Sequence, residues 1–391
     1  MKRTLLLITL IWISSFGFSQ TYNLKISSYV TFLEKQNISA KEYIFDLFKQ
    51  YDIVILCERD HAETTQYKLI LDILGDKRFT ENIDNAYFEV GNAAYNDTLN
   101  RFLQNSSLSS KQVSQSIMSI QRNIFPVLWE KSVYSYLLNG VYNINNQQPN
   151  EKKIHIYGLD ESVMWETVTK EDIHLLVSHA ADRDSILADN FIHYYKNSKT
   201  KKALVVLNYR HAFLRDLPKQ NAGRFIADRF KGKVANVYLN SFAPLRSKQN
   251  DSKTPQIVID TPQKGKWEAA FIQARKEDVG FNLKVTPFGK DSFDIMPVDN
   301  NFLYSDMFTG FIYYNHFKNL HRSLGIKNYI DKQFAPELSR RIKLQQEYMK
   351  ILFRKELTLD DLWNVNKILN SSYLKEYPDV IKEIEQWLKT K

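Results

Sequence analysis

The sequence contains little cysteine, glycine or proline, and each of these scarcities restricts the class of protein. Cys57 is the single cysteine among 391 residues, so no disulfide can form within the chain and the fold must depend on its hydrophobic core. Only 12 glycines and 10 prolines are present, whereas aromatic residues make up 13% of the chain. This balance predicts a packed globular protein and argues against a disordered one.

Several motifs of common enzyme classes are also missing. The sequence has no Gly-x-Ser-x-Gly elbow, and Cys57 lies inside an apolar segment, which argues against a serine or cysteine nucleophile. It has no phosphate-binding loop and no dinucleotide fingerprint. The close ligand spacing of a His-Glu-x-x-His helix is absent as well. The sequence therefore requires neither a metal nor a cofactor, and we expect none.

Long runs of like charge are absent, although the net charge is +9. The basic residues are scattered and no nucleic-acid motif occurs, so we expect a solvated basic surface and no nucleic-acid partner. An excess of basic over acidic residues also favours contact with acidic ligands. We expect the partner to be a small-molecule substrate or ligand.

The N-terminus has the pattern of a signal peptide. Lys2 and Arg3 precede an apolar run, residues 5–12, and small and polar residues follow as far as Gln20. The apolar run is about half of the ~20 residues that a membrane span needs, which argues against the alternative of a membrane anchor. We therefore expect residues 1–20 to be removed, with the cut near Gln20 or Thr21. The mature protein would be periplasmic or secreted, with no integral membrane segment.

Short apolar segments alternate with helical ones through most of the chain. Strands are expected at residues 52–57, 85–90, 153–157, 202–207, 234–239, 256–259, 283–286 and 311–314. Strands that alternate with helices predict crossovers, hence an α/β fold with a layered, mostly parallel sheet and helices on both faces. We assign residues 21–330 to this domain. Residues 331–391 read as a helical C-terminal appendage, with helices near 338–352, at 359–369 and after Pro378.

Polar residues follow four of the expected strands, at the point where each strand ends. Ligands of open parallel sheets bind beyond the carboxyl ends of the strands, and a buried unpaired charge is costly, so these residues are predicted to form a site. The candidate catalytic residues are Glu58, His61, Glu89 and His211. The candidate substrate-binding residues are Asp60, Asp160, Asn208 and Arg210.

This set of residues suits the activation of water. A Glu–His pair can deprotonate water, and a second His or Glu can act as the acid. An Arg or His can stabilise a developing oxyanion. Two His and two Glu are also plausible ligands for zinc or manganese, so a metal stays an alternative. Each residue also has a structural alternative: Glu58 or Asp60 caps the next helix, and Glu63 interacts with the dipole of that helix. Arg210 alternatively neutralises Glu89 in a structural ion pair.

Four segments, in order along the chain, resemble motifs of the erythromycin-esterase-like family. Cys57–His61 resembles its Gly-Glu-x-x-His box, and Phe88–Glu89 its strand-terminal Glu. Arg183–Asn190 resembles its Arg-Asp-x-x-Met-Ala-x-Asn helix, and Asn208–His211 its His-Asn-x-His strand end. The resemblance covers about residues 40 to 315. The family belongs to a wider group that includes Tiki/TraB-type proteases and ChaN-like haem-binding proteins.

The resemblance implies a hydrolase in which Glu58, His61, Glu89 and His211 are site residues and His61 is the general base for water. The chain departs from the family pattern at two positions: Cys57 replaces the glycine of the box, and Asn208 stands in place of the first histidine of the strand end. Two alternatives stay open. One is a non-catalytic protein that binds haem or another ligand on the same scaffold, and the other is a metal-dependent peptidase of the Tiki/TraB kind.

Overall fold

The computed structural model describes residues 23–126, 129–178, 182–215, 220–241, 243–246, 257–296, 302–353, 356 and 358–389. The expected signal peptide, residues 1–20, lies outside the described residues, so its removal and the export of the protein stay predictions. Among the described helices, none has both the length and the apolar character that a bilayer span requires.

A sheet of seven strands forms the centre of the molecule, in the spatial order β3-β2-β4-β1-β5-β9-β8. The strands are β1 (Ile53–Glu58), β2 (Asn85–Phe88), β3 (His155–Gly158), β4 (Ala203–Asn208), β5 (Val234–Leu239), β8 (Asp278–Asn282) and β9 (Gly310–Tyr314). All neighbouring pairs are parallel except β8 and β9, which are antiparallel. Strands adjacent in space are rarely adjacent in sequence, as expected for crossover connections.

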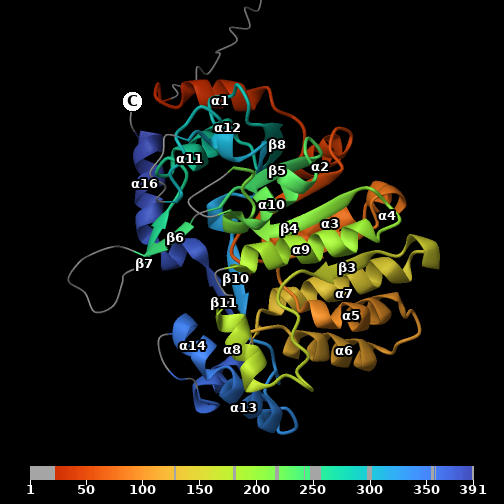
Figure 1. Cartoon of the computed structure of the whole chain (residues 1–391). Coiled ribbons are helices and arrows are strands. Elements are labelled where there is room, and N and C mark those ends of the chain that lie inside the picture. The colour runs from red at the N-terminus through yellow and green to blue at the C-terminus, as the bar shows by residue number, and fades with distance from the viewer. Residues whose placement is uncertain are drawn as a thin grey trace, which may run out of the picture.

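Helices cover both faces of this sheet (Figure 1). Along the buried strand β1, Ile53 and Ile55 pack into one hydrophobic core, and Val54 and Leu56 pack into the other. The first core includes side chains of α1 (Ser27–Glu34), α9 (Arg183–Lys196), α10 (Ala222–Arg229), α11 (Lys266–Ala274) and α12 (Tyr304–Met307). The second includes side chains of α2 (Ala40–Phe48), α3 (Thr65–Leu74), α4 (Lys77–Asn82), α5 (Asn96–Gln104), α6 (Ser110–Arg122) and α7 (Ser132–Asn146). The predicted layered α/β class is confirmed.

Two of the predicted strands are placed differently. Residues 283–286 form a turn, in which Val285 is exposed and has a left-handed φ of 61°, and the strand is instead β8 immediately before them. The predicted strand at 256–259 is β7 (Ile257–Asp260), which pairs with β6 (Ala243–Arg246) in an antiparallel ribbon outside the main sheet. Both predicted segments are only four residues long, which is too short for periodicity to decide their place.

The C-terminal segment lies in two parts of the molecule. Helices α13 (Ala335–Leu344) and α14 (Gln346–Phe353) lie near α8 (Lys170–Ser178), whereas α16 (Pro378–Lys389) lies beside α11 (Figure 1). The prediction of a helix at 359–369 is wrong for the last residues of that range, which are not helical. A 3₁₀ helix, η6 (Asp360–Asn366), is followed by strand β11 (Leu369–Ser372), which pairs with β10 (His321–Leu324). The side-chain oxygen of Asn366 accepts the backbone N–H of Ile330, and its side-chain NH₂ donates to the carbonyl of Ile330. These bonds hold Asn366 at the end of the helix.

The remaining elements are short. They are the 3₁₀ helices η1 (Ala93–Tyr95), η2 (Asn150–Lys152), η4 (Tyr209–His211) and η5 (Phe317–Asn319), and the single-turn helix α15 (Tyr373–Glu376). Of these, η4 directly follows β4 and carries His211. It therefore places one of the predicted site residues at the carboxyl edge of the sheet.

Candidate functional site

The register of three adjacent strands brings the predicted site residues to one edge of the sheet. In the order β2-β4-β1, Glu58 at the end of β1 pairs with Asn208 at the end of β4, and Phe88 at the end of β2 pairs with Val206. Glu89 follows Phe88 directly, and its backbone N–H donates to the carbonyl of Val206 at 2.9 Å. The three strand ends therefore lie side by side, as the sequence predicts.

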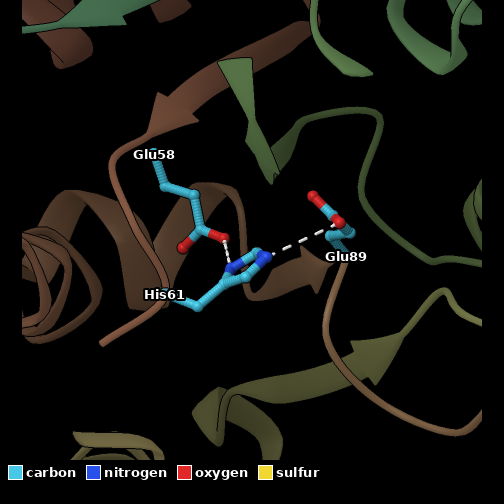
Figure 2. A group of neighbouring side chains, drawn as sticks. All are labelled: Glu58, His61 and Glu89. Atoms are coloured by element: carbon cyan, nitrogen blue, oxygen red, sulfur yellow. Dashed lines mark ion pairs between the residues drawn. The ribbon is translucent and has the colours of Figure 1, made fainter. Parts of the chain in front are cut away.

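His61 lies between two buried glutamates (Figure 2). Its Nδ1 is in ion-pair contact with Glu58, and its Nε2 lies 3.7 Å from Oε1 of Glu89. The side chains of Glu58 and Glu89 are each only 3% exposed, whereas that of His61 is 22% exposed. The carboxylate of Glu58 thus orients the ring and leaves Nε2 directed toward Glu89 and the solvent-accessible space.

His211 lies on the other side of Glu89 in a matching arrangement. Its Nδ1 donates to Oδ1 of Asp184 at 2.8 Å, and its Nε2 lies 3.5 Å from the same Oε1 of Glu89. The oxygen of Asp184 also accepts the backbone N–H of Ala222 at 2.8 Å, which holds the carboxylate in place. Two imidazoles, each with a carboxylate at Nδ1, therefore direct Nε2 to one oxygen.

Arg183 neutralises Glu89 and joins two of the strand ends. Its guanidinium donates to both oxygens of Asp160, at 2.9 and 2.7 Å, and to Glu89 at 3.1 Å, while Nη1 lies 3.2 Å from Nε2 of His211. The backbone after β2 lies close to the end of β3: a Cβ added to Gly91 would lie 2.4 Å from Cα of Gly158.

The pKa values of the acids follow from this pairing. Burial acts to raise the pKa of Glu89, but the positive charges of His211, Arg183 and His61 outweigh burial and hold that pKa well below its ordinary value. Burial raises the pKa of Glu58, and the nearby His61 only partly offsets this. Glu89 is therefore a fixed negative charge, whereas Glu58 holds a proton more readily.

Both histidines bind a proton more tightly than in solution. Burial opposes the charge on His61, but Glu58 and Glu89 outweigh burial and raise the pKa of His61 to about 9. Burial also opposes the charge on His211, yet Glu89 and the hydrogen bond to Asp184 raise its pKa as well. The carboxylates at Nδ1 therefore increase the basicity of both imidazoles.

The four predicted substrate-binding residues have different surroundings. Asp160 accepts a hydrogen bond from the guanidinium of Arg183. Asn208 has a structural role, since its backbone N–H donates to Glu89 at 2.7 Å and its side-chain amide donates to the carbonyl of Arg59 at 3.2 Å. Asp60 accepts the backbone N–H of Ala62 at 2.7 Å and is paired with Arg322 at 3.0 Å. Asp160, Asn208 and Asp60 are therefore each engaged in contacts within the protein and are not fully available to a ligand.

Arg210, the fourth predicted substrate-binding residue, is exposed, and its Nε donates to the hydroxyl of Tyr209 at 3.2 Å. Glu89 forms ion pairs with Arg183, His211 and His61, so Arg183 takes the place of Arg210 in the expected Arg210–Glu89 pair. Glu63, by contrast, interacts with the amino end of α3 as expected, because its carboxylate accepts the backbone N–H groups of Thr65 and Gln66.

Arg183 and Asp184 were not among the site residues predicted from the sequence. Both lie on α9, between β3 and β4 in the chain, and neither follows a strand. The available signal was the adjacent Arg-Asp pair at the start of an amphipathic helix, a motif that the resemblance included but to which no role was given. Only the packing of α9 on the sheet brings Asp184 to His211.

Two cavities meet at His61 and Glu89. One, of about 440 Å³, is lined by polar groups that include Lys131, Arg210 and His211. The other, of about 320 Å³, is lined largely by apolar groups. A larger cavity of about 750 Å³ lies elsewhere, between α6 and α13, and contains none of the candidate residues. His61 and Glu89 therefore line the 440 and 320 Å³ cavities, His211 lines the 440 Å³ one, and none of them lines the largest of the three.

Glu58, His61 and Glu89 also form a possible cation-binding group. One donor atom from each lies within 4.8 Å of the others. Two carboxylates and one imidazole suit a divalent cation such as Zn²⁺ or Mn²⁺. The donor types therefore fit a metal, which would compete with the proton that Glu58 and His61 share.

Comparisons with known proteins support the architecture. No family model and no curated protein matches the sequence. The structure of a Bacillus cereus protein matches with a TM-score of 0.50 and 12% sequence identity, over 73% of this chain and 96% of that one. The chain shares the fold of that protein.

Two further structural neighbours are more distant. A variant of the erythromycin esterase EreC in its open conformation matches with a TM-score of 0.48 and 10% identity, over 72% of this chain and 95% of that one. ChaN of Campylobacter jejuni, solved with cofacially bound haem, matches with a TM-score of 0.34 and 15% identity, over 56% of this chain and 91% of that one. These two neighbours come from the groups that the sequence motifs resemble.

Proposed function

We propose that this chain is an exported hydrolase in which His61, oriented by Glu58, activates water for attack on an ester, lactone or amide. The observation that carries the proposal is the convergence of two carboxylate-supported imidazoles on Glu89, with Nε2 of His61 at 3.7 Å and Nε2 of His211 at 3.5 Å from the same oxygen. A base and an acid on either side of one polar cavity are what hydrolysis by water requires.

The reaction assigns a role to each group. Nε2 of His61 takes a proton from water, and the resulting hydroxide oxygen forms a bond to the carbonyl carbon. The bond between that carbon and the leaving oxygen or nitrogen then breaks, and His211 donates the proton from Nε2 to the leaving group. Glu58 and Asp184 orient the two rings at Nδ1. Glu89 stabilises the imidazolium of His61 as it forms, and the imidazolium of His211 until it gives up its proton.

The proposal is tested with a panel of esters, lactones and amides. We expect wild-type protein to hydrolyse members of the panel, and His61→Ala and His211→Ala each to lower kcat by about 10²- to 10⁴-fold while the circular dichroism spectrum is retained. Wild-type protein that hydrolyses no member of the panel would count against the hydrolase, and a folded double variant that hydrolyses the panel at the wild-type rate would exclude His61 and His211 as its base and acid. Protein recovered from its native host should begin near Gln20 or Thr21, and an intact Met1 there would contradict export.

A metal-dependent peptidase is the second candidate, and the donor group of Glu58, His61 and Glu89 favours it. It predicts stoichiometric Zn²⁺ or Mn²⁺ after purification, and activity that is lost with a chelator and restored by the ion. Under the proposed metal-free mechanism, a chelator should leave hydrolysis unchanged. Elemental analysis together with the chelator assay separates the two.

A further inference from the structure

Attack of hydroxide on a carbonyl group places a negative charge on the carbonyl oxygen, and the proposed mechanism needs a donor that stabilises this charge. His61 and His211 already act as base and acid. The guanidinium of Arg183 is engaged by two carboxylates and lies against His211, and Arg322 is paired with Asp60. The donor for the oxyanion must therefore be another residue.

The reacting carbonyl group must lie in the 440 Å³ cavity. His61 and His211 both line that cavity, whereas His61 alone of the two is among the described residues that line the 320 Å³ cavity. A base and an acid that act on one substrate must both be able to reach it. Lys131 lines the same 440 Å³ cavity, so its ammonium group and the two imidazoles face one space.

An aromatic ring and a buried amide hold Lys131 beside the proposed base. Its Nζ lies 3.9 Å from the centre of the Trp129 ring, and that ring lies edge-on to the imidazole of His61, with the centroids 5.2 Å apart. The buried side chain of Gln121 donates to the backbone carbonyls of Trp129 and Lys131, at 3.4 and 3.1 Å. The positive charge is close enough to His61 to act against the rise in the pKa of that residue.

The ammonium group of Lys131 is available to a hydrogen-bond acceptor. Within the described part of the chain, its Nζ forms no hydrogen bond and no ion pair. Of the acids on the cavity wall, Asp60 and Glu89 are each paired with an arginine. The third, Glu130, is described as well, and it forms no ion pair with Lys131 either.

A lysine at this position does not contribute to the stability of α7. Lys131 is the N-cap residue of that helix, its side chain makes no capping hydrogen bond, and the first turn contains no acid. The helix dipole opposes a positive charge at the amino end, where Ser, Thr, Asp and Asn are the usual caps. The contact with the Trp129 ring positions the charge but does not neutralise it. A residue that breaks a local rule in this way is expected at a functional site.

On the basis of the proposed hydrolase function, we infer that Lys131 is a catalytic residue that stabilises the oxyanion. As hydroxide bonds to the carbonyl carbon, an electron pair of the C=O double bond moves to the oxygen, which accepts a hydrogen bond from Nζ of Lys131. When the bond to the leaving group breaks, that pair returns and the carbonyl re-forms, while Lys131 keeps its protons. From the sequence an arginine or a histidine was expected in this role, and a lysine at the start of α7 takes it.

The test compares an ester with the matching thionoester, in which sulfur replaces the carbonyl oxygen. Sulfur is a weak hydrogen-bond acceptor, so a donor at this atom accelerates the ester more than the thionoester. We expect Lys131→Met to lower kcat and kcat/KM for the ester together, by about 10²- to 10³-fold. The ratio of ester to thionoester rates should fall by about tenfold or more. A change in the pKa of His61 affects both substrates equally, so this ratio reports on the carbonyl oxygen alone.

Two further variants serve as controls. Lys131→Arg keeps a positive donor and should retain more of the ester rate than Lys131→Met. Lys49 has a side chain that is 76% exposed and is paired with Asp46, and it lines neither cavity. Lys49→Met should therefore leave the rates and their ratio unchanged.

Urea denaturation separates the catalytic role from a structural one. Lys131→Met should unfold at or above the urea concentration of the wild type, because it removes a charge from the positive end of α7. A variant that is less stable, and whose activity falls only with the folded fraction, would make Lys131 structural and overturn the inference.

The outcomes also separate this inference from the proposed function. An active wild type with a Lys131→Met variant of equal kcat, or of equal ester-to-thionoester ratio, would overturn the role of Lys131 and leave the hydrolase standing. Wild-type protein that hydrolyses no ester would overturn both.

Discussion

His211 and Asp184 are joined by a hydrogen bond of 2.8 Å between Nδ1 and Oδ1, although one residue follows β4 and the other lies in the first turn of α9. The bond fixes the tautomer of the imidazole, because Nδ1 carries the donated proton and Nε2 is left toward Glu89. It also raises the pKa of His211. Asp184 is therefore a positioning residue for the proposed acid.

We expect Asp184→Asn to lower kcat by about 10- to 100-fold with little change in KM. The same substitution should lower the pKa of His211, because the negative charge at Nδ1 is removed. The pKa is measured from the imidazole resonances in an NMR titration, alongside the pH–rate profile. Asp189→Asn, at an exposed position of the same helix, is the control. Loss of activity with an unchanged His211 titration would contradict the positioning role.

The contact between His61 and Glu58 should appear as an energetic coupling. His61→Ala leaves the carboxylate of Glu58 buried without its partner, so we expect the free energy of unfolding at pH 7 to fall by about 1–3 kcal/mol. Adding Glu58→Gln should restore part of that loss, since the remaining group is neutral. Urea denaturation of the wild type, both single variants and the double variant measures the coupling. Additive single effects would show that the pair is energetically independent.

The pH dependence of hydrolysis follows from the pKa of His61, which is raised to about 9. A general base must be deprotonated and the acid protonated, so kcat/KM should rise as His61 loses its proton and fall once His211 loses its own. Glu58→Gln should move this rise to lower pH, because the carboxylate that stabilises the imidazolium is removed. The profile is recorded on a neutral ester with a leaving group that ionises outside the range. The same profile is recorded for His211→Ala, and a rate that falls between pH 6 and 9 in that variant would make His61 an acid and not a base.

Glu161 is expected to destabilise the protein at alkaline pH. Burial, together with the adjacent Asp160, raises the pKa of Glu161 from 4.5 to about 7. The folded state therefore holds a proton that the unfolded state has already lost, and the free energy of unfolding falls as pH rises from about 4.5 to 7. Glu161→Gln mimics the neutral acid, so it should raise stability above pH 7 by about 1–3 kcal/mol.

Denaturation of the Glu161→Gln variant at two pH values checks this directly. At pH 4 the wild-type side chain is already protonated, so the two proteins should unfold at the same urea concentration. At pH 8 the variant should require more urea. A difference of equal size at both pH values would mean that the substitution acts through packing and not through the charge.

Particular residues show where the sequence was sufficient for the site and where it was not. Glu58, Glu89 and His211 were selected because each follows an apolar strand, and parallel strands end at one edge. Arg210 was considered as the partner of Glu89 because it is close in sequence to His211. The structure instead pairs Glu89 with Arg183, which comes from a helix packed on the sheet. Pairing across elements leaves no periodic pattern in the chain.

The same contrast applies to the fold. By itself the sequence determined the alternation of strands and helices, the α/β class and the polar ends of the strands, because burial imposes a pattern on neighbouring residues. Only the tertiary structure decided that β2, β4 and β1 are adjacent and that Asp184 hydrogen-bonds His211. It also decided that Tyr348 lines the 320 Å³ cavity beside His61 and Glu89. These contacts join residues far apart in the chain, and they depend on how complete elements pack against one another, which local periodicity does not encode.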